Sequence, residues 1–412
     1  MYYGRIAYNK TLTELYLTNL YILDYRNLSE ADIALAPKVN CFVGLNGMGK
    51  TNILDCVYML SFTKSSLTSH DTDCIRHDAP AAMLRGTYMP DPADADNQTA
   101  GTTDSAEDRQ IVISCTLRQG AKKQFRRQQK VYQRNIDHIG LIPLVMVSPA
   151  DQQLISEGSD ERRRFMDSVI SQYDRVYLEH LTAYQQLLKQ RNAMLKQFDQ
   201  QQPTEADNAL FDILEQQLAD HAQYIHLQRR QFVESFLPYF HQIYQQISDD
   251  KEHTGLSYLT QLDNRDLLTA LAQHRQRDLI LGWTTQGVHK DDLEMTLNGY
   301  PLRQTGSQGQ QKTFLLSLKL AEALFLADKH SRNELSNIQS QNRKPILLLD
   351  DIFDRLDSER VQRIISIVSS NRFGQIFITD TDRQHISQLL QLSPADKKLF
   401  EVTNGQVREI LQ

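Results

Sequence analysis

The stretch Gly44-Leu45-Asn46-Gly47-Met48-Gly49-Lys50-Thr51 fits the P-loop pattern, in which a glycine and four further residues precede Gly-Lys-Ser/Thr. The residues before it, Val39–Val43, are predicted to form a short buried strand. Residues 52–62 carry apolar side chains at helical spacing. A strand, a glycine-rich loop and a helix in this order predict a phosphate site made of backbone N–H groups and a helix N-terminus.

The residue types of this loop indicate a nucleoside triphosphate with its cation. Lys50 is expected to face solvent in the absence of nucleotide and to reach the β- and γ-phosphates, while the Thr51 hydroxyl binds Mg²⁺. The expected nucleotide-binding residues are Gly44, Leu45, Asn46, Gly47, Met48, Gly49, Lys50, Thr51 and Asn52.

Composition sets the class of protein. The 412 residues predict two or three domains, and 40% hydrophobic with 23% charged residues is typical of a soluble globular protein. We expect no membrane span, because no apolar run approaches about 20 residues. We also expect no signal peptide, because the stretch after Met1 is polar and aromatic and has no apolar core segment. The four cysteines form no CxxC pair, which favours free thiols in a reducing cytoplasm and no zinc site. Because the net charge is −6, a nucleic-acid partner would need a local basic patch.

A helical region interrupts the α/β pattern. Residues 159–201 contain no Gly or Pro, and their apolar residues form a seam interrupted only by His180 and Arg191. After a break at residues 201–204, a second run carries His221 and Gln228 in its gaps. The pattern predicts two long helices folded back as an antiparallel hairpin, whose aromatic residues are core.

The second half of the predicted ATP site is the apolar strand of residues 345–351, which ends in Asp350 and Asp351. Asp350 is expected to hold Mg²⁺ as a Walker B carboxylate, and Asp351 to position or deprotonate the attacking water. Because the P-loop lies far upstream, the nucleotide domain must be split. We therefore predict an ATPase head of residues 1–150 and 275–412, with a helical-hairpin lobe of residues 151–274 inserted in it.

A third motif precedes this strand. In residues 307–312 a serine comes before glycine and a helix, so backbone amides could bind a second anion. An ordinary capped helix is the alternative. Together with the other two motifs, residues 307–312 resemble the signature sequence of ABC-type ATPases. In those proteins the signature of one subunit closes on a nucleotide held by another subunit. The residues concerned are Ser307, Gly309 and Gln310. Residues 354–357 resemble the D-loop, and Thr379 stands where ABC transporters carry a switch histidine.

With these motifs in view, nearly the whole chain resembles the RecF family of recombination and gap-repair ATPases, which is related to the SMC proteins. The resemblance rests on Asp24-Tyr25-Arg26-Asn27, the P-loop, Ser148-Pro149-Ala150-Asp151, residues 157–167, residues 189–193, Gly287-Val288-His289-Lys290-Asp291-Asp292-Leu293, the signature and Leu349-Asp350-Asp351. Lys64-Ser65-Ser66 departs from the family pattern, and residues 90–110 and 331–343 are expected to be surface insertions.

The resemblance implies an ABC/SMC-type α/β head that binds ATP and Mg²⁺, forms an ATP-dependent homodimer on DNA and hydrolyses ATP weakly as a switch. It implies single-stranded and duplex DNA at gaps as substrate, and RecR and RecO as partners in loading recombinase onto strands coated by single-strand-binding protein. Roles in replication-fork maintenance and the SOS response are also implied.

Several cations have two interpretations. Arg26 contacts the nucleotide or ends a strand. Residues 162–164, all arginine, contact DNA phosphate or face acidic residues, and Arg126, Arg127 and Lys130 on a basic hairpin are similar candidates. His289 and Lys290 are given no chemistry, whereas Asp151 and Gln152 are candidates for the nucleotide-sensing Q-loop.

Three other classes of protein stay open. An ABC transporter motor would need a membrane partner and normally the switch histidine. An OLD-type nuclease ATPase would need a further metal-binding domain, for which the chain after Asp351 is too short. A structural SMC-like clamp would need much longer coiled coils.

Overall fold

The computed structural model describes residues 15–90, 110–198, 203–248, 252–263, 265–331, 344–353, 356–370, 372–381 and 397–410. Most of the two expected insertions, the break at residues 201–202 and residues 354–355 of the expected D-loop lie outside the described residues. The chain forms two compact units, residues 1–149 with 323–412 and residues 150–322. This division places the first boundary between residues 149 and 150 and includes residues 275–322 in the second unit.

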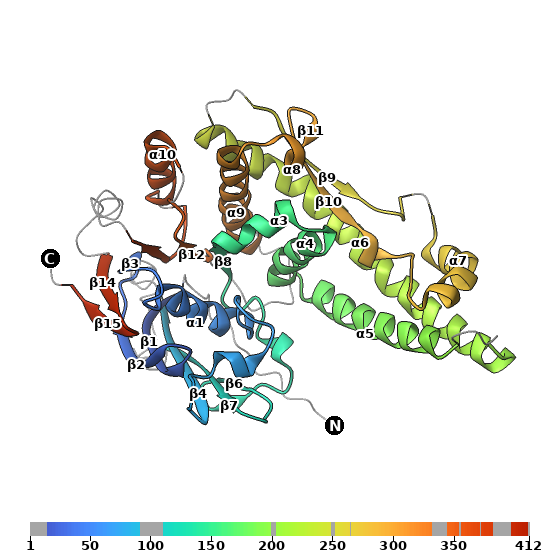
Figure 1. The fold of residues 1–412 in the computed structure, drawn as a ribbon, viewed down its shortest axis with the longest axis horizontal. Coiled ribbons are helices and arrows are strands. Elements are labelled where there is room, and N and C mark those ends of the chain that lie inside the picture. The colour runs from blue at the N-terminus through green and yellow to red at the C-terminus, as the bar shows by residue number, and fades with distance from the viewer. Residues whose placement is uncertain are drawn as a thin grey trace, which may run out of the picture. The chain divides into compact units, whose positions relative to one another are not determined.

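Among its described residues, the first unit contains two six-stranded sheets (Figure 1). One is antiparallel, with the order β2-β1-β4-β5-β6-β7. Its strands are β1 (Leu15–Tyr25), β2 (Leu28–Ala34), β4 (Ala81–Pro90), β5 (Ile111–Arg118), β6 (Gln124–Arg127) and β7 (Lys130–Val131). A short 3-10 helix, Asp71–Cys74, precedes β4, and another, Asn135–Asp137, follows β7.

The second sheet has the order β15-β14-β3-β13-β12-β8, and only the edge strand β15 runs antiparallel to its neighbour. Its strands are β3 (Val39–Val43), β8 (Leu144–Val147), β12 (Ile346–Asp350), β13 (Ile376–Asp380), β14 (Lys397–Thr403) and β15 (Gln406–Glu409). Strands β3, β12 and β13 are buried at every residue, as expected of parallel strands covered on both faces. Helix α10 (Ser358–Val368) connects β12 to β13.

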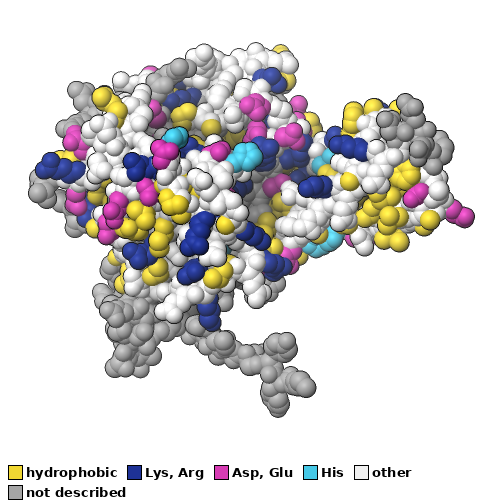
Figure 2. Space-filling model, turned by 60° about the horizontal axis from the view of Figure 1, so that its bottom comes forward, with side chains coloured by type: hydrophobic (Ala, Val, Ile, Leu, Met, Phe, Trp, Pro, Cys, Tyr) yellow, Lys and Arg dark blue, Asp and Glu magenta, His cyan; other side chains and the backbone are white. Residues whose placement is uncertain are grey.

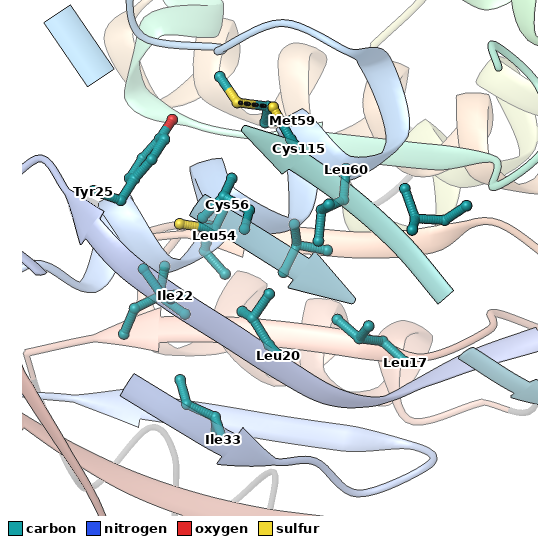
Figure 3. Packing of buried hydrophobic residues seen from close by; sticks show 14 of the residues in the cluster. Leu17, Leu20, Ile22, Tyr25, Ile33, Leu54, Cys56, Met59, Leu60 and Cys115 are labelled. Carbon is teal, nitrogen blue, oxygen red and sulfur yellow. Dashed lines mark hydrogen bonds between the residues drawn. The ribbon is translucent and has the colours of Figure 1, made fainter. Parts of the chain in front are cut away.

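Helix α1 (Lys50–Phe62) begins directly after the glycine-rich loop and packs against strands of both sheets. Its side chains Leu54, Cys56, Met59 and Leu60 lie among those of the antiparallel sheet, and the Met59 sulfur is 3.9 Å from that of Cys115 (Figure 3). All four cysteines are buried free thiols. Because α1 is held from two sides, its N-terminal residues Lys50 and Thr51 have fixed positions.

The second unit is mainly helical. Its helices are α3 (Gln153–Ser156), α4 (Ser159–Tyr173), α5 (Arg175–Gln197), α6 (Glu205–Ile247), α7 (Leu267–Leu281), α8 (Leu302–Thr305) and α9 (Gln308–Ser331), the last of which continues into the first unit. A sheet of β9 (Thr254–Leu259), β10 (Asp292–Leu297) and β11 (Tyr300–Pro301) completes it. Short 3-10 helices span Pro149–Gln152 and Val288–Lys290. The pairing of β10 with β9, and the packing of α7 on α6, explain why residues 275–322 belong here.

Helices α5 and α6 form the expected antiparallel hairpin (Figure 1). The sequence predicted a continuous first helix, and this is corrected at Asp174, where the backbone is extended and α4 ends. The Asp174 carboxylate accepts the N–H of Tyr177 and so caps α5. Helix α6 begins with a capping box between Thr204 and Asp207.

Three of the polar residues that interrupt the predicted seam have polar partners within the second unit. Arg191 is fully buried and forms ion pairs of 2.7 Å with both Glu215 of α6 and Asp278 of α7. The ring nitrogens Nδ1 of His180 and His221 lie 3.0 Å apart across the two helices. A second buried arginine, Arg229, pairs with Asp167 and Asp291.

Candidate nucleotide site

The glycine-rich loop follows β3 at the carboxyl edge of the parallel sheet. Gly47 and Gly49 have φ angles of +78° and +111°, which favour glycine because side chains clash there. A Cβ on Gly44 would lie 2.3 Å from the Val402 carbonyl oxygen. The turn at Gly405 supports the loop from behind, since its N–H donates to the Met48 carbonyl. Packing and backbone geometry thus both require glycine in this loop.

Lys50 is buried, which corrects the expectation that it faces solvent. Its Nζ donates to the carbonyl oxygens of Gly44 at 2.6 Å and Leu45 at 3.0 Å. Burial lowers the pKa of Lys50, although the neighbouring Asp351 and Asp350 act in the opposite direction. The ammonium therefore already lies within the loop where phosphates would bind.

Asp350 ends β12 and lies next to Thr51 and Thr379. Its carboxylate accepts hydrogen bonds from Thr51 Oγ1, at 2.9 and 3.1 Å, and from Thr379 Oγ1 at 2.5 Å. Strand β13 lies between β3 and β12, so Thr379 comes beside Asp350 in the ladder. Burial raises the pKa of Asp350. These hydroxyl and carboxylate oxygens suit Mg²⁺, whose charge would offset the cost of burying the ionised carboxylate.

Asp351 lies just beyond the strand, with its backbone in the left-handed region at φ 51°. Its N–H donates to Thr379 Oγ1 at 3.1 Å. A cavity of about 210 Å³ is lined by Asn46, Gly47, Gly49, Lys50, Thr51, Asn52, Pro149, Asp350 and Asp351. The two predicted halves of the ATP site therefore lie at one cavity, whose loop amides, cation and oxygen ligands fit a triphosphate with its metal.

Arg26 does not line this cavity. It lies in the β1–β2 turn at φ 51°, with its Nε 3.9 Å from Asp55 of α1. Its neighbour Asn27 contacts the loop instead, since Asn27 Oδ1 accepts from Asn52 at 2.7 Å and its Nδ2 donates to the Gly47 carbonyl at 3.4 Å. Asn27 belongs to the stretch Asp24-Tyr25-Arg26-Asn27 that carries the resemblance, and this was the sequence signal for the contact.

Asp55 shows what the departing residues Ser65 and Ser66 do. The carboxylate is fully buried, and it accepts hydrogen bonds from the hydroxyls of Tyr25, Ser65 and Ser66 at 2.6–2.7 Å. Ser65 and Ser66 thus hold the turn after α1 against the helix, and these hydrogen bonds give both serines a structural role.

The signature belongs to the second unit. Ser307 is the exposed residue before α9, and its Oγ accepts the N–H of Gln310 at 3.3 Å. The Ser307 N–H in turn donates to Gln310 Oε1 at 2.8 Å, so the two residues form a reciprocal cap. Gln152, the Q-loop candidate, donates to Gln311 at 2.7 Å. The start of α9 is thus a capped helix N-terminus, in which Ser307 and Gln308 are exposed.

The candidate DNA-binding cations differ in their surroundings. Arg162 forms a bidentate pair with Asp292, at 2.6 and 2.9 Å, which favours its structural interpretation. Arg163 bonds to the Asp291 carbonyl and to Asp160. The Arg164 side chain is 73% exposed, although it pairs with Glu161. The hairpin residues Arg126 and Lys130 are exposed.

Charge on the visible surface is mixed. Figure 2 shows Lys and Arg side chains in small groups with Asp and Glu groups between them. Any DNA contact on this face would thus be local.

His289 is a packing residue: its ring bonds to Tyr184 and to the Thr284 carbonyl, and burial lowers its pKa to about 4. Within the described ranges, no helix combines the length and apolarity needed to cross a bilayer.

Comparison with known proteins gives the class first. The model of the RecF/RecN/SMC N terminal domain matches residues 16–405. The Smc head domain of Pyrococcus furiosus, 14% identical, superposes with a TM-score of 0.52 over 96% of each chain, which supports the same fold. The fold and the site thus define a P-loop head of the class that RecF, RecN and SMC proteins share, and the prediction of an ABC/SMC-type α/β head is confirmed.

Closer relatives define the family within this class. The "DNA replication and repair protein RecF" of Parabacteroides distasonis is 45% identical over 392 residues, 95% of this chain and 98% of the relative. That of Bacteroides thetaiotaomicron is 45% identical over 394 residues, 96% and 98% of the two chains. A solved structure, "the recombination mediator protein RecF-ATP in RecFOR pathway", is 25% identical and superposes with a TM-score of 0.79 over 98% of this chain and all of the other. The chain belongs to the RecF family.

Proposed function

We propose that the chain is an ATP-gated DNA-binding protein of DNA replication and repair. The observation that carries this is the meeting of Lys50 and Thr51 with Asp350 and Asp351 at one cavity, although 299 residues separate Thr51 from Asp350. A related RecF whose structure contains ATP supports ATP as the ligand. Thr51 and Asp350 would hold Mg²⁺, which neutralises phosphate charge when bound.

The resemblance extends the proposal to partners. RecR and RecO are the proposed partners, and the cytoplasm is the proposed location. The complex would act at gaps whose single strands are coated by single-strand-binding protein, where it would help load recombinase. The relative described in the RecFOR pathway supports this assignment. Functions in fork maintenance and the SOS response form part of the same proposal. ATP hydrolysis would be weak and would serve to release the DNA-bound state.

The gating requires two copies, because Ser307 would complete the site of a partner. We expect ATP to promote a dimer and ADP not to do so. Ser307→Arg should bind ATP as a monomer but fail to dimerise, because a bulky cation replaces the capping hydroxyl where the partner's nucleotide would approach. Sedimentation velocity in ATP, ADP and no nucleotide measures the dimer fraction. Equal fractions in all three conditions would remove the composite site from the proposal.

DNA binding provides the main test of the function. With a net charge of −6, affinity must come from local clusters of Lys and Arg, and each phosphate contact should add roughly 0.9 to the slope of log affinity against log salt. We expect ATP to raise the affinity for DNA, since a dimer doubles the contacts. Arg126→Gln with Lys130→Gln should lower the slope by about two units if both residues contact phosphate.

The measurement is fluorescence anisotropy with single-stranded, duplex and gapped DNA, each with ATP, with ADP and without nucleotide. Arg162→Gln is the matched control for the local cation clusters, because its guanidinium is already paired with Asp292. An affinity that is the same with and without ATP would contradict gating by nucleotide.

A further inference from the structure

The side-chain amide of Gln310 in the signature is held at both ends. Its Oε1 accepts the N–H of Ser307 at 2.8 Å, and its Nε2 donates to Glu252 Oε1 at 2.6 Å. Glu252 lies outside the motif, between the end of α6 and β9. The cap at the start of α9 is therefore fixed to the body of the second unit by one carboxylate.

Glu252 is itself held by the end of α6. Its other oxygen, Oε2, accepts the hydroxyl of Tyr244, a residue that is 1% exposed. The ring of Phe314 on α9 lies 6.1 Å from that of Tyr244 and 4.7 Å from that of Phe240. The first turns of α9 and the last turns of α6 thus share a packed core, and Glu252 extends that contact to the signature.

This arrangement determines what Ser307 can offer a ligand. A hydroxyl has one hydrogen to donate and two lone pairs to accept with. Because Ser307 Oγ already accepts the Gln310 N–H, its own hydrogen is available for an anionic oxygen. The N–H groups of Gln308 and Gly309, in the first turn of α9, have no intrahelical acceptor by position. A fixed cap presents these donors without the entropic cost of ordering them on binding.

We propose that Glu252 is a positioning residue for the signature, acting through Gln310 to keep the Ser307 cap preformed for the γ-phosphate of a partner's ATP. The inference rests on the proposed function, in which the signature closes on a nucleotide held by a second copy. The negative charge of Glu252 is not needed for this role, because a glutamine at this position also accepts from Gln310 and pairs with Tyr244.

The test uses the full chain with Glu252→Ala and Glu252→Gln. In ATP with Mg²⁺, Glu252→Ala should weaken dimerisation by up to roughly tenfold, which corresponds to the loss of one intramolecular hydrogen bond. Glu252→Gln should dimerise as well as the wild type or better. It keeps the hydrogen bond from Gln310 and removes a negative charge near the γ-phosphate of the partner's ATP. Binding of a fluorescent ATP analogue to the monomer should be unchanged in both variants, since the P-loop is intact.

A double-mutant cycle shows whether Glu252 acts through Gln310. Gln310→Ala alone should weaken dimerisation at least as much as Glu252→Ala, and adding Glu252→Ala to it should cost no more. Additive losses, normal dimerisation of Glu252→Ala, or a Glu252→Gln variant as weak as Glu252→Ala would each overturn the proposal.

Hydrogen exchange separates this inference from the proposed function. In monomeric protein without nucleotide, Glu252→Ala should increase exchange of the amides of Ser307 and Gln310, and Glu252→Gln should not. If the wild type fails to dimerise in ATP, the composite site is refuted, but the exchange result still decides whether Glu252 fixes the cap. Unchanged exchange in Glu252→Ala would overturn the positioning role in either case.

Discussion

Lys50→Met is expected to lower ATP affinity by roughly 100-fold or more, because each hydrogen bond from a charged donor is worth about 1.5–3 kcal/mol and the ammonium would bind two phosphates. Methionine has a similar length and no charge. The substitution also leaves the carbonyls of Gly44 and Leu45 without the donor they have in the structure. We therefore expect a loss of stability of about 1–3 kcal/mol, which is too small to unfold the protein.

Filter binding with ATP, together with thermal unfolding, measures both effects of this change. Lys50→Arg is the matched control, since it keeps the positive charge and should retain more affinity than Lys50→Met. If Lys50→Met bound and hydrolysed ATP like the wild type, the assignment of the loop as a nucleotide site would be wrong.

Asp351→Asn is expected to preserve ATP binding and to trap the dimer on DNA. Asparagine retains the shape of aspartate and also tolerates the left-handed backbone found at this residue, so the fold should not change. It removes the negative charge that would orient or deprotonate the attacking water. Because dimer release would await the loss of the γ-phosphate contact, DNA dissociation should slow together with hydrolysis.

Hydrolysis should be slow in the wild type as well. ABC-type sites usually carry glutamate where this chain has Asp351, and aspartate is one methylene shorter. A catalytic group misplaced by about 1 Å can cost on the order of 100-fold in rate. Such a rate suits a timer that keeps a dimer on DNA.

Single-turnover hydrolysis and DNA dissociation, followed in the same samples, test this timer. We expect the two rates to fall in parallel in Asp351→Asn. Wild-type turnover faster than several per second, or a mutant that leaves DNA as fast as the wild type, would leave Asp351 with a structural role only.

The elements of the nucleotide site could be predicted because their signals are local. The loop Gly44–Thr51 lies directly between a strand signal in Val39–Val43 and a helix signal in residues 52–62, and the apolar strand before Asp350 is also recognised from adjacent residues alone. Their meeting followed from the class of fold, because the carboxyl ends of parallel strands share one edge of a sheet. Thr379 beside Asp350 depends on the strand order instead, which the sequence does not state.

What the sequence could not indicate depends on contacts between distant residues. Lys50 is buried because the carbonyls of its own loop bend round the ammonium, and the support from Gly405 comes from the far end of the chain. The break at Asp174 was hidden because apolar residues continue at helical spacing through it. Glu252 carries no motif at all, and only its place beside Gln310 connects it to the signature.

Arg191 also has a consequence for how the helical hairpin carries load. An apolar seam alone would let α5 slide along α6 by one turn with similar burial. A slide of about 5.4 Å would separate the Arg191 guanidinium from Glu215 and Asp278. Glu215 would keep its pair with Arg275, but the buried Arg191 and Asp278 would lose theirs, at a cost of several kcal/mol. The buried ion pairs therefore specify a single register of α5 against α6. Tension applied to either helix is therefore transmitted to both. The hairpin can move as one rigid body, but α5 cannot slide along α6.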